Sequence, residues 1–203
     1  MVVEIFAAII IGYFLGSIPF ALVIGKIFYN TDIRNYGSKN LGGSNAGRVL
    51  GKKAGIGVMT MDILKVTMAI FITSLFAKNE NALIISGLSA AFGHCFPIFA
   101  HFKGGKAVAT MYGFLFGMAL IGGYGFGIFF FPLVVFLLIL YIGKIVALAS
   151  VGSAIANTIY IYFALDSFGM LVASLLFTVV MIVRHRKNFE RMLRHEENKI
   201  SWM

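Results

Sequence analysis

A Lys-Gly-Gly-Lys segment at residues 103–106 combines residue types that can bind an anionic group. It lies in the second polar segment of the chain, residues 93–110, which interrupts a series of apolar runs and also contains His94 and His101. Glycines leave backbone N–H groups unhindered, lysines supply ammonium donors, and the helix expected directly afterwards has a positive N-terminal end. Together these groups are the parts of a phosphate or carboxylate site. The alternative is a basic loop whose lysines only orient the protein in a membrane.

The first polar segment of the chain, residues 28–54, combines serine, asparagine and basic residues with glycines. Such groupings form turns whose hydroxyl and amide groups can point inward. Arg48 adds a planar guanidinium fork that suits a phosphate group. Because charged and neutral donors together are the usual means of holding a phosphorylated small molecule, a binding site is the favoured interpretation. The alternative is a solvated loop with capping serines and orienting charges.

The elements that must position these segments are apolar runs. With 60% hydrophobic residues and a mean hydropathy of +0.92, the chain is predicted to be an integral membrane protein. A spanning helix needs about 17–25 residues, so the sequence predicts an all-α, polytopic membrane protein of about seven transmembrane helices in a single domain, residues 1–203. The spans are expected near Val3–Ile24, Gly55–Phe76, Ala82–Ala100, Ala107–Gly123, Gly125–Ile142, Ile145–Leu165 and Phe168–Val183. Glu4 precedes the first run without a basic segment, which favours a spanning helix over a cleaved signal peptide.

The net charge of +9 comes from basic residues that lie between the apolar runs. This pattern suits membrane orientation better than a nucleic-acid groove, so no nucleic-acid partner is expected. If the N-terminus lies outside, nearly all lysines and arginines fall on the inner side and only Lys78 falls outside, with Lys65 inside a span. The sequence therefore predicts an odd number of helices with the C-terminus in the cytoplasm.

Asp62 and Lys65 lie inside the second predicted span. At positions i and i+3 they share a helix face and can pair. Charges within a span are costly and often functional, but these two lie only about two turns from the cytoplasmic end. A structural role is therefore favoured, in which Lys65 extends toward the interface or Asp62 braces a basic neighbour.

Two C-terminal segments carry weaker signals. The span near Ile145–Leu165 opens with many small residues, including Ser150, and such a density usually indicates close helix packing. If the last span continues past Arg184, His185 and Asn188 share a face and can reach a polar ligand. The alternative is a basic segment that touches anionic lipid. A histidine among several cations tends to stay neutral, which suits it as a hydrogen-bond partner or base.

Several common active-site signatures are missing from the sequence. Neither Lys52 nor Lys106 has the glycine and the following Ser/Thr of a P-loop, and there is no G-x-S-x-G elbow. The single cysteine, Cys95, excludes an intramolecular disulfide and lies in an apolar run with no activating partner, so it is expected to be inert. No metal and no cofactor is expected.

Taken together, four segments of the chain resemble the bacterial acyl-phosphate-dependent glycerol-3-phosphate acyltransferases, the PlsY family. The resemblance extends over nearly the full length. Ala107 stands where the family usually has a glycine, Ser44 where it has a threonine and Ala147 where it often has a serine. The similar segments are Gly16–Phe20 with Gly37–Gly55, Gly93–Thr110, Ile145–Ser153 and Arg184–Glu197.

The resemblance implies transfer of a fatty acyl group from acyl phosphate to the 1-hydroxyl of glycerol 3-phosphate, giving lysophosphatidate and phosphate in the first step of phospholipid synthesis. It implies seven spans, an external N-terminus and an active site at the cytoplasmic face of the bacterial inner membrane. The expected partners are the two substrates, the lipid bilayer and other enzymes of phospholipid synthesis. The residues implied to contact the phosphates in catalysis are Ser38, Arg48, Lys106, His185 and Asn188. Those implied to bind substrate or shape the pocket are Asn40, Ser44, Asn45, His94, Lys103, Gly104 and Gly105, with Glu197 and Ser150 in structural roles nearby.

The implied chemistry agrees with the residue types. Two phosphorylated substrates need several cationic and N–H donors, and an activated acyl phosphate needs mainly alignment. The base is either His185 or a substrate phosphate, whose second pKa is about 6. The alternative function is a small membrane transporter for an anionic or phosphorylated metabolite. A transporter is expected to carry polar residues near the midplane in paired repeats, whereas these polar residues crowd one face and no repeat is evident.

Overall fold

The computed structural model describes residues 1–200 and consists of two compact units, residues 1–123 and the part of the chain from residue 124 onward. Within residues 1–200 the regular elements are helices and there are no strands, so the predicted all-α class is confirmed. The prediction of a single domain stays a prediction.

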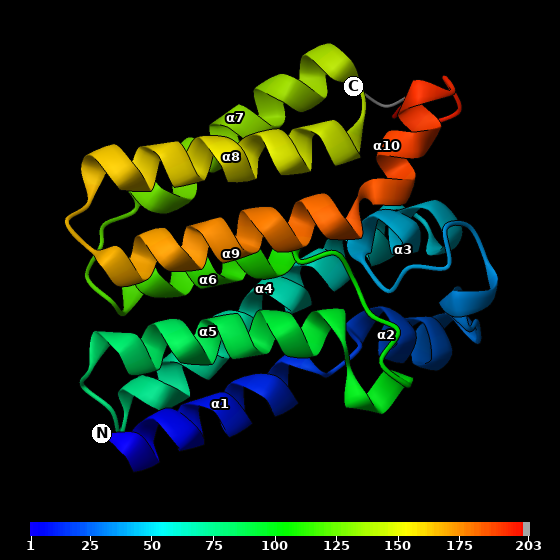
Figure 1. Ribbon diagram of the computed structural model, residues 1–203. Coiled ribbons are helices and arrows are strands. Elements are labelled where there is room, and N and C mark those ends of the chain that lie inside the picture. The colour runs from blue at the N-terminus through cyan, green and yellow to red at the C-terminus, as the bar shows by residue number, and fades with distance from the viewer. Residues whose placement is uncertain (201–203) are drawn as a thin grey trace. The chain divides into compact units, whose positions relative to one another are not determined.

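The first unit contains six α-helices and two short 3₁₀ helices (Figure 1). Helix α4 is central to it, because α1, α3, α5 and α6 all pack against α4. Its elements are α1 (Val2–Gly16), α2 (Phe20–Tyr29), η1 (Ile33–Asn35), α3 (Gly43–Leu50), α4 (Lys52–Ser74), α5 (Glu80–Cys95), η2 (Ile98–Ala100) and α6 (Val108–Leu120).

Proline residues break two of the predicted helices. The predicted span Val3–Ile24 is formed by α1 and α2, which are separated at Ser17–Pro19. Pro19 has no N–H to donate and disfavours helical backbone at the residue before it. In the same way the predicted span Ala82–Ala100 is α5 followed by η2, with Pro97 between them. Each of these predicted spans therefore contains a break at its proline, although Val2–Tyr29 and Glu80–Ala100 are each long and apolar enough to cross a membrane.

Small residues allow α1 and α5 to lie side by side (Figure 1). A Cβ added at Gly12 would lie 2.3 Å from the carbonyl oxygen of Ser86, and one at Gly16 would lie 1.9 Å from that of Ala90. Such close backbone approach is typical of helix packing in membranes. The second polar segment starts at the C-terminal end of α5, so packing against α1 fixes the helix that leads into this segment.

Helix α3 forms inside the first polar segment, where the sequence predicts turns. A Cβ added at Gly55 would lie 2.6 Å from the Cα of Gly47, so these glycines let α3 approach the start of α4. The two helices are joined at Gly51, whose φ of +98° suits glycine. As a result Ser44 and Arg48 are carried by a helix that is packed on α4.

The second unit consists of α7 (Gly127–Gly143), α8 (Val146–Ala164), α9 (Phe168–Arg184) and α10 (Arg186–Leu193). Helix α8 packs against both α7 and α9 (Figure 1). The last three predicted spans correspond to α7, α8 and α9 within a few residues at each end. The last span does not continue straight, because α9 and α10 are bent by 52° at His185.

Within residues 1–200, four helical segments are long and apolar enough to cross a membrane, or five if the bent pair α9–α10 is one span. Helices α6 and α7 are shorter apolar helices. The four segments are Val2–Tyr29, Lys52–Ser74, Glu80–Ala100 and Val146–Ala164. The number of seven spans and the orientation of the termini stay predictions.

Candidate active site

Asn45 organises the first polar segment from a buried position at the start of α3. Its side-chain oxygen accepts a hydrogen bond from the backbone N–H of Ser38 at 2.8 Å. Its amide nitrogen donates to the carbonyl oxygens of Ile33, Tyr36 and Asn40. Because one side chain satisfies so many backbone groups, Asn45 fixes the shape of the loop that presents Ser38.

The glycine pair of the second polar segment lies against His94 at the end of α5. The sequence predicts that the backbone N–H groups of these glycines are open to a ligand. The N–H of Gly105 instead donates to the His94 carbonyl oxygen at 3.0 Å. A Cβ at Gly105 would lie 1.9 Å from His94 Nε2, and one at Gly104 would lie 2.0 Å from the His94 carbonyl oxygen. The glycines therefore permit the turn to fold onto a histidine.

A hydrogen bond joins the two polar segments of the first unit. The side-chain nitrogen of Asn40 donates to the Gly104 carbonyl oxygen at 3.2 Å, although the two residues are 64 positions apart. The segments that carry Arg48 and Lys106 thus meet at one end of this unit. Sequence spacing gave no indication of this contact.

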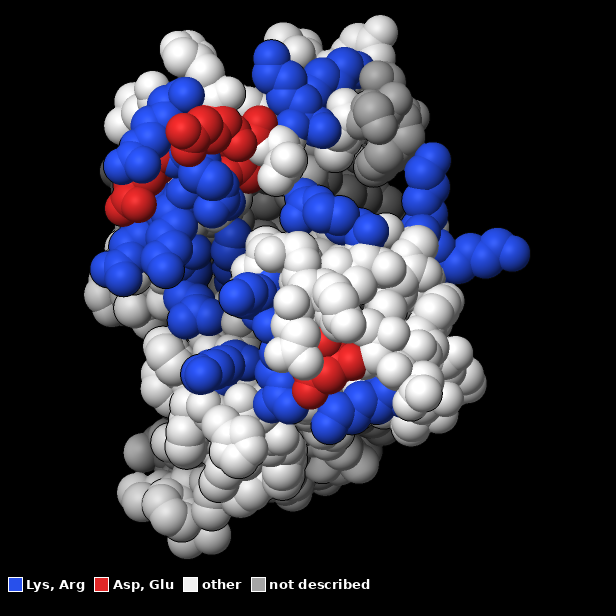
Figure 2. All heavy atoms as spheres, turned by 90° about the vertical axis from the view of Figure 1, so that its right-hand side faces the viewer, with Lys and Arg blue, Asp and Glu red and all other residues white. Residues whose placement is uncertain are grey.

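Basic and hydroxyl side chains remain accessible around this contact. Lys106 is half-buried, while the exposed residues are Ser38, Lys39, Ser44, Arg48 and Lys103. On the face drawn in Figure 2, blue basic side chains predominate over red acidic ones. Accessible cations and hydroxyl groups on two connected loops match what a phosphorylated ligand requires.

Helix α6 begins at Val108, directly after the Lys-Gly-Gly-Lys turn. Ala107 precedes it with φ of +64°, a left-handed conformation that glycine adopts more readily. Such a backbone suits the glycine that the family resemblance implies at this position, and Ala107 adopts it here. The positive end of α6 therefore follows the two lysines.

An ion pair lies next to the first loop, outside the predicted site. Arg34 donates hydrogen bonds to both carboxylate oxygens of Asp32, to Oδ1 at 2.9 Å and to Oδ2 at 2.6 Å. These bonds lower the pKa of Asp32 to about 2 and raise the pKa of Arg34 above its usual value. Lys26 lies 3.9 Å from the same carboxylate. The guanidinium of Arg34 thus compensates the charge of the Asp32 carboxylate.

Asp62 and Lys65 pair as the sequence predicts, but Lys65 does not extend to the interface. Its ammonium lies 2.8 Å from Asp62 Oδ1 and 3.1 Å from His94 Nδ1, and it donates to the Ile18 carbonyl oxygen at 2.9 Å. The relative exposures are only 1% for Asp62, 5% for Lys65 and 6% for His94. The link to His94 joins residues far apart in the sequence.

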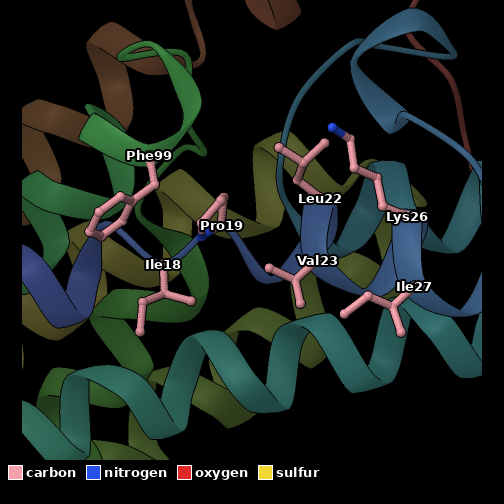
Figure 3. Close-up of a pocket in the computed structure, with 7 residues that line it drawn as sticks. All are labelled: Ile18, Pro19, Leu22, Val23, Lys26, Ile27 and Phe99. Atoms are coloured by element: carbon pink, nitrogen blue, oxygen red, sulfur yellow. The ribbon is translucent and has the colours of Figure 1, made fainter.

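An apolar groove with a volume of about 490 Å³ lies along α2 (Figure 3). Figure 3 shows Phe99, from the second polar segment, at one side of the groove and Lys26 at the other. Its lining residues are Ile18, Pro19, Leu22, Val23, Lys26, Ile27 and Phe99. This lining suits an apolar chain better than a polar ligand.

In the second unit, His185 and Asn188 lie at the bend between α9 and α10 and are both buried. His185 Nδ1 lies 2.8 Å from the Met181 carbonyl oxygen, so a neutral ring donates from Nδ1 and has its acceptor at Nε2. Asn188 donates to Glu197 Oε1 at 2.8 Å, and Arg191 donates to Glu197 Oε2 at 2.7 Å. Glu197 thus ties the chain after α10 back to that helix.

Two other residues have packing roles. The buried hydroxyl of Ser150 donates to the Val146 carbonyl oxygen at 2.8 Å, within α8. Cys95 is buried at the end of α5. Within residues 1–200, no group of three or more His, Cys, Asp or Glu side chains is placed to bind a metal ion.

The family model described as glycerol-3-phosphate acyltransferase matches residues 6–195. The chain belongs to the glycerol-3-phosphate acyltransferase family. Relatives that match over nearly the full length carry the same name as the family. The chain is 43% identical to the glycerol-3-phosphate acyltransferase of Bacillus subtilis, with 96% of this chain and 97% of the relative covered. It is 47% identical to glycerol-3-phosphate acyltransferase 2 of Bacillus anthracis, with 95% and 97% covered.

Solved structures of this acyltransferase family have the same fold. The crystal structure of PlsY, an integral membrane glycerol 3-phosphate acyltransferase, in its glycerol 3-phosphate form has a TM-score of 0.88 at 33% identity, with 97% of this chain and 96% of that chain covered. The lysophosphatidic acid form has a TM-score of 0.85 at 32% identity, with 97% and 95% covered.

These comparisons confirm the predicted family and the predicted acyltransferase function. The protein is an integral membrane acyltransferase, and the alternative of a membrane transporter is not supported.

Proposed function

We propose that the protein transfers a fatty acyl group from acyl phosphate to the 1-hydroxyl of glycerol 3-phosphate, producing lysophosphatidate and phosphate. The observation that carries the proposal is the hydrogen bond from Asn40 to Gly104, which connects the Arg48 segment to the Lys-Gly-Gly-Lys turn. Related PlsY crystals described as glycerol 3-phosphate and lysophosphatidic acid forms support this acceptor and this product.

The residue types favour two bound phosphates. Arg48 offers a bidentate fork, Lys103 and Lys106 offer ammonium groups, and the N-terminus of α6 adds a partial positive charge. Ser38 and Ser44 add hydroxyl donors on the same loops. We assign these groups to binding and alignment, since cationic groups that are already in place stabilise charge on a leaving phosphate.

The transfer step needs no cofactor in this scheme. The acceptor hydroxyl oxygen attacks the acyl carbonyl carbon, the bond from that carbon to the phosphate oxygen breaks, and phosphate leaves. The hydroxyl proton goes to His185 or to a substrate phosphate, both of which suit neutral pH. We propose His185 and Asn188 as catalytic residues on their chemistry and on the resemblance of their segment to the family. The alkyl chain needs an apolar surface, and the groove along α2 offers one in the first unit.

We further propose that the protein resides in the bacterial inner membrane with seven spans, an external N-terminus and a cytoplasmic active site. The distribution of basic residues supports this orientation. Other enzymes of phospholipid synthesis are proposed partners, because the product is itself a lipid intermediate.

The test is an assay of the purified protein in detergent with glycerol 3-phosphate and either acyl phosphate or acyl coenzyme A. Lysophosphatidate is expected when the acyl donor is acyl phosphate and not when it is acyl coenzyme A. Formation of the product from acyl coenzyme A but not from acyl phosphate would refute the proposed donor.

Direct transfer is tested by the intact mass of the protein after mixing with acyl phosphate alone. No stoichiometric acyl adduct is expected, since Cys95 is buried and a covalent route needs a nucleophile with a base in hydrogen-bond reach. An adduct that disappears on addition of glycerol 3-phosphate would replace direct transfer with a covalent mechanism.

A further inference from the structure

We propose that Asp62, Lys65 and His94 form a positioning network that holds the Lys-Gly-Gly-Lys turn in its ligand-binding shape. The inference rests on the proposed role of this turn in binding a substrate phosphate. None of the three side chains needs to touch the substrate for this role.

The network connects three separate elements of the first unit. Lys65, from α4, contacts Asp62 in its own helix at 2.8 Å and His94 at the end of α5 at 3.1 Å. It also donates to the carbonyl oxygen of Ile18, at the break between α1 and α2. An ammonium group with these partners fixes the end of α5 relative to both α4 and the break.

Nδ1 of His94 faces both charged members of the network: it lies 3.1 Å from the Lys65 ammonium and 3.6 Å from Asp62 Oδ1. These two contacts fix the orientation of the ring. Nε2 is the atom that faces Gly105, where an added Cβ would lie 1.9 Å from it. The orientation of the ring therefore sets how closely the turn can approach α5.

His94 holds the turn through its backbone as well. Its carbonyl oxygen accepts the N–H of Gly105 at 3.0 Å, and Gly104 packs against the same carbonyl. Any rotation of the His94 ring or displacement of its backbone must therefore move Gly104 and Gly105. The lysines on either side of them would move too.

A purely structural explanation for the buried charges is weak. Replacing a buried ion pair with apolar residues of similar volume is often neutral or stabilising, so packing alone does not require Asp62 and Lys65. The paired charges also cancel, so the network adds little net positive charge to the phosphate site. Geometric control of the turn accounts for both features.

The test is the double variant Asp62→Leu/Lys65→Met, which removes both charges and leaves neither unpaired. We expect the KM for at least one phosphorylated substrate to rise about tenfold or more, since small misplacements of binding groups have effects of this size. The thermal unfolding temperature should stay near that of the parent protein. Asp62→Asn keeps the shape of the side chain but leaves the buried Lys65 ammonium without its carboxylate, so it should lower the unfolding temperature and also raise the same KM. Measured on the folded fraction, it decides the question if the double variant does not fold.

The control is Thr73→Val, which removes a buried hydrogen bond of 2.9 Å from Thr73 to Ser86 between the same two helices. It should lower thermal stability without changing KM. A parental KM in the folded Asp62→Leu/Lys65→Met or Asp62→Asn variant would overturn the inference.

Lys106→Ala, measured in parallel, distinguishes failure of the positioning network from failure of the proposed phosphate site at the turn. If Lys106→Ala raises KM and the network variants do not, the network inference fails while the proposed phosphate site stands. If Lys106→Ala leaves KM unchanged, the turn is not a phosphate site and both ideas fail, whatever the network variants do.

Discussion

At the scale of single residues, asparagines and glycines shape the polar loops of the first unit, while cations and hydroxyl groups stay at their surface. Asn45 is almost fully buried and bonded within its own loop, whereas Arg48 is exposed. The family resemblance implies phosphate contact for Arg48 and substrate binding or pocket shaping for Asn45. The structure separates a residue that builds the loop from one that remains available to a ligand.

The first prediction concerns Arg48→Lys. This change keeps the positive charge but loses the planar fork that binds two phosphate oxygens at once. We expect kcat/KM to fall by about 10- to 100-fold, which corresponds to losing about 1.4–2.7 kcal/mol of transition-state stabilisation. Steady-state kinetics with both substrates varied would measure the loss. Lys53→Arg, at another exposed position near α3, is the matched control and should retain parental activity.

The second prediction concerns Gly105→Ala. The new Cβ would lie 1.9 Å from His94 Nε2, and the contact of His94 with Lys65 prevents the ring from moving freely. We expect a loss of about 1–3 kcal/mol in the free energy of unfolding and a clear rise in KM.

The matched control for this change is Gly57→Ala in α4, where an added Cβ would have no neighbour within 4 Å. That variant should be as stable as the parent protein or more stable, since alanine favours helix. Thermal unfolding in detergent compares the two variants. Equal stability of both would mean that the Gly105–His94 contact is looser than the structure indicates.

At the scale of elements, the length of the apolar runs predicted where the long helices lie, but not how they are interrupted. The runs that became α4, α7, α8 and α9 were identified within a few residues. Pro19 and Pro97 were visible in the sequence, yet the apolar runs around them were long enough to suggest continuous spans. Helix α3 was missed because its glycines favour turns locally, and only packing against α4 makes a helix there favourable.

The third prediction concerns the tie between α10 and the chain that follows it. Glu197→Ala removes the acceptor for both Asn188 and Arg191, leaving buried Asn188 without this partner. We expect the variant to lose about 1–3 kcal/mol of stability. Glu197→Gln can still accept from Asn188 and should lose less.

Thermal unfolding of these variants, with Glu196→Gln at an exposed neighbouring position as the control, provides the measurement. If Glu197→Ala unfolds at the parental temperature, the carboxylate does not stabilise this segment. A fall in activity without a fall in stability would instead point to a direct effect on Asn188.

At the scale of the whole molecule, composition alone was sufficient to predict a helical membrane protein. The contacts that define the candidate site could not be predicted, because they join distant positions such as Asn40 with Gly104 and Lys65 with His94. Such contacts depend on how the helices pack, which the length and composition of the apolar runs do not determine. The family resemblance supplied residue roles, while the structure adds physical reasons for several of them.

The last prediction tests the orientation of the chain in the membrane. In a Cys95→Ala background, single cysteines at Lys39, Lys103 and Lys187 should react with a membrane-impermeant thiol reagent only from the cytoplasmic side. The reason is that loops rich in lysine and arginine are retained in the cytoplasm. A cysteine at Lys78, in the loop predicted to lie on the opposite side, should react only from outside. All four positions are exposed, so a failure to react would reflect the side of the membrane and not burial. Right-side-out and inverted vesicles provide the two sides, and detergent-solubilised protein provides the full labelling control. If Lys103 reacted from outside while Lys39 reacted from inside, the two loops could not share one phosphate site, despite the hydrogen bond between Asn40 and Gly104.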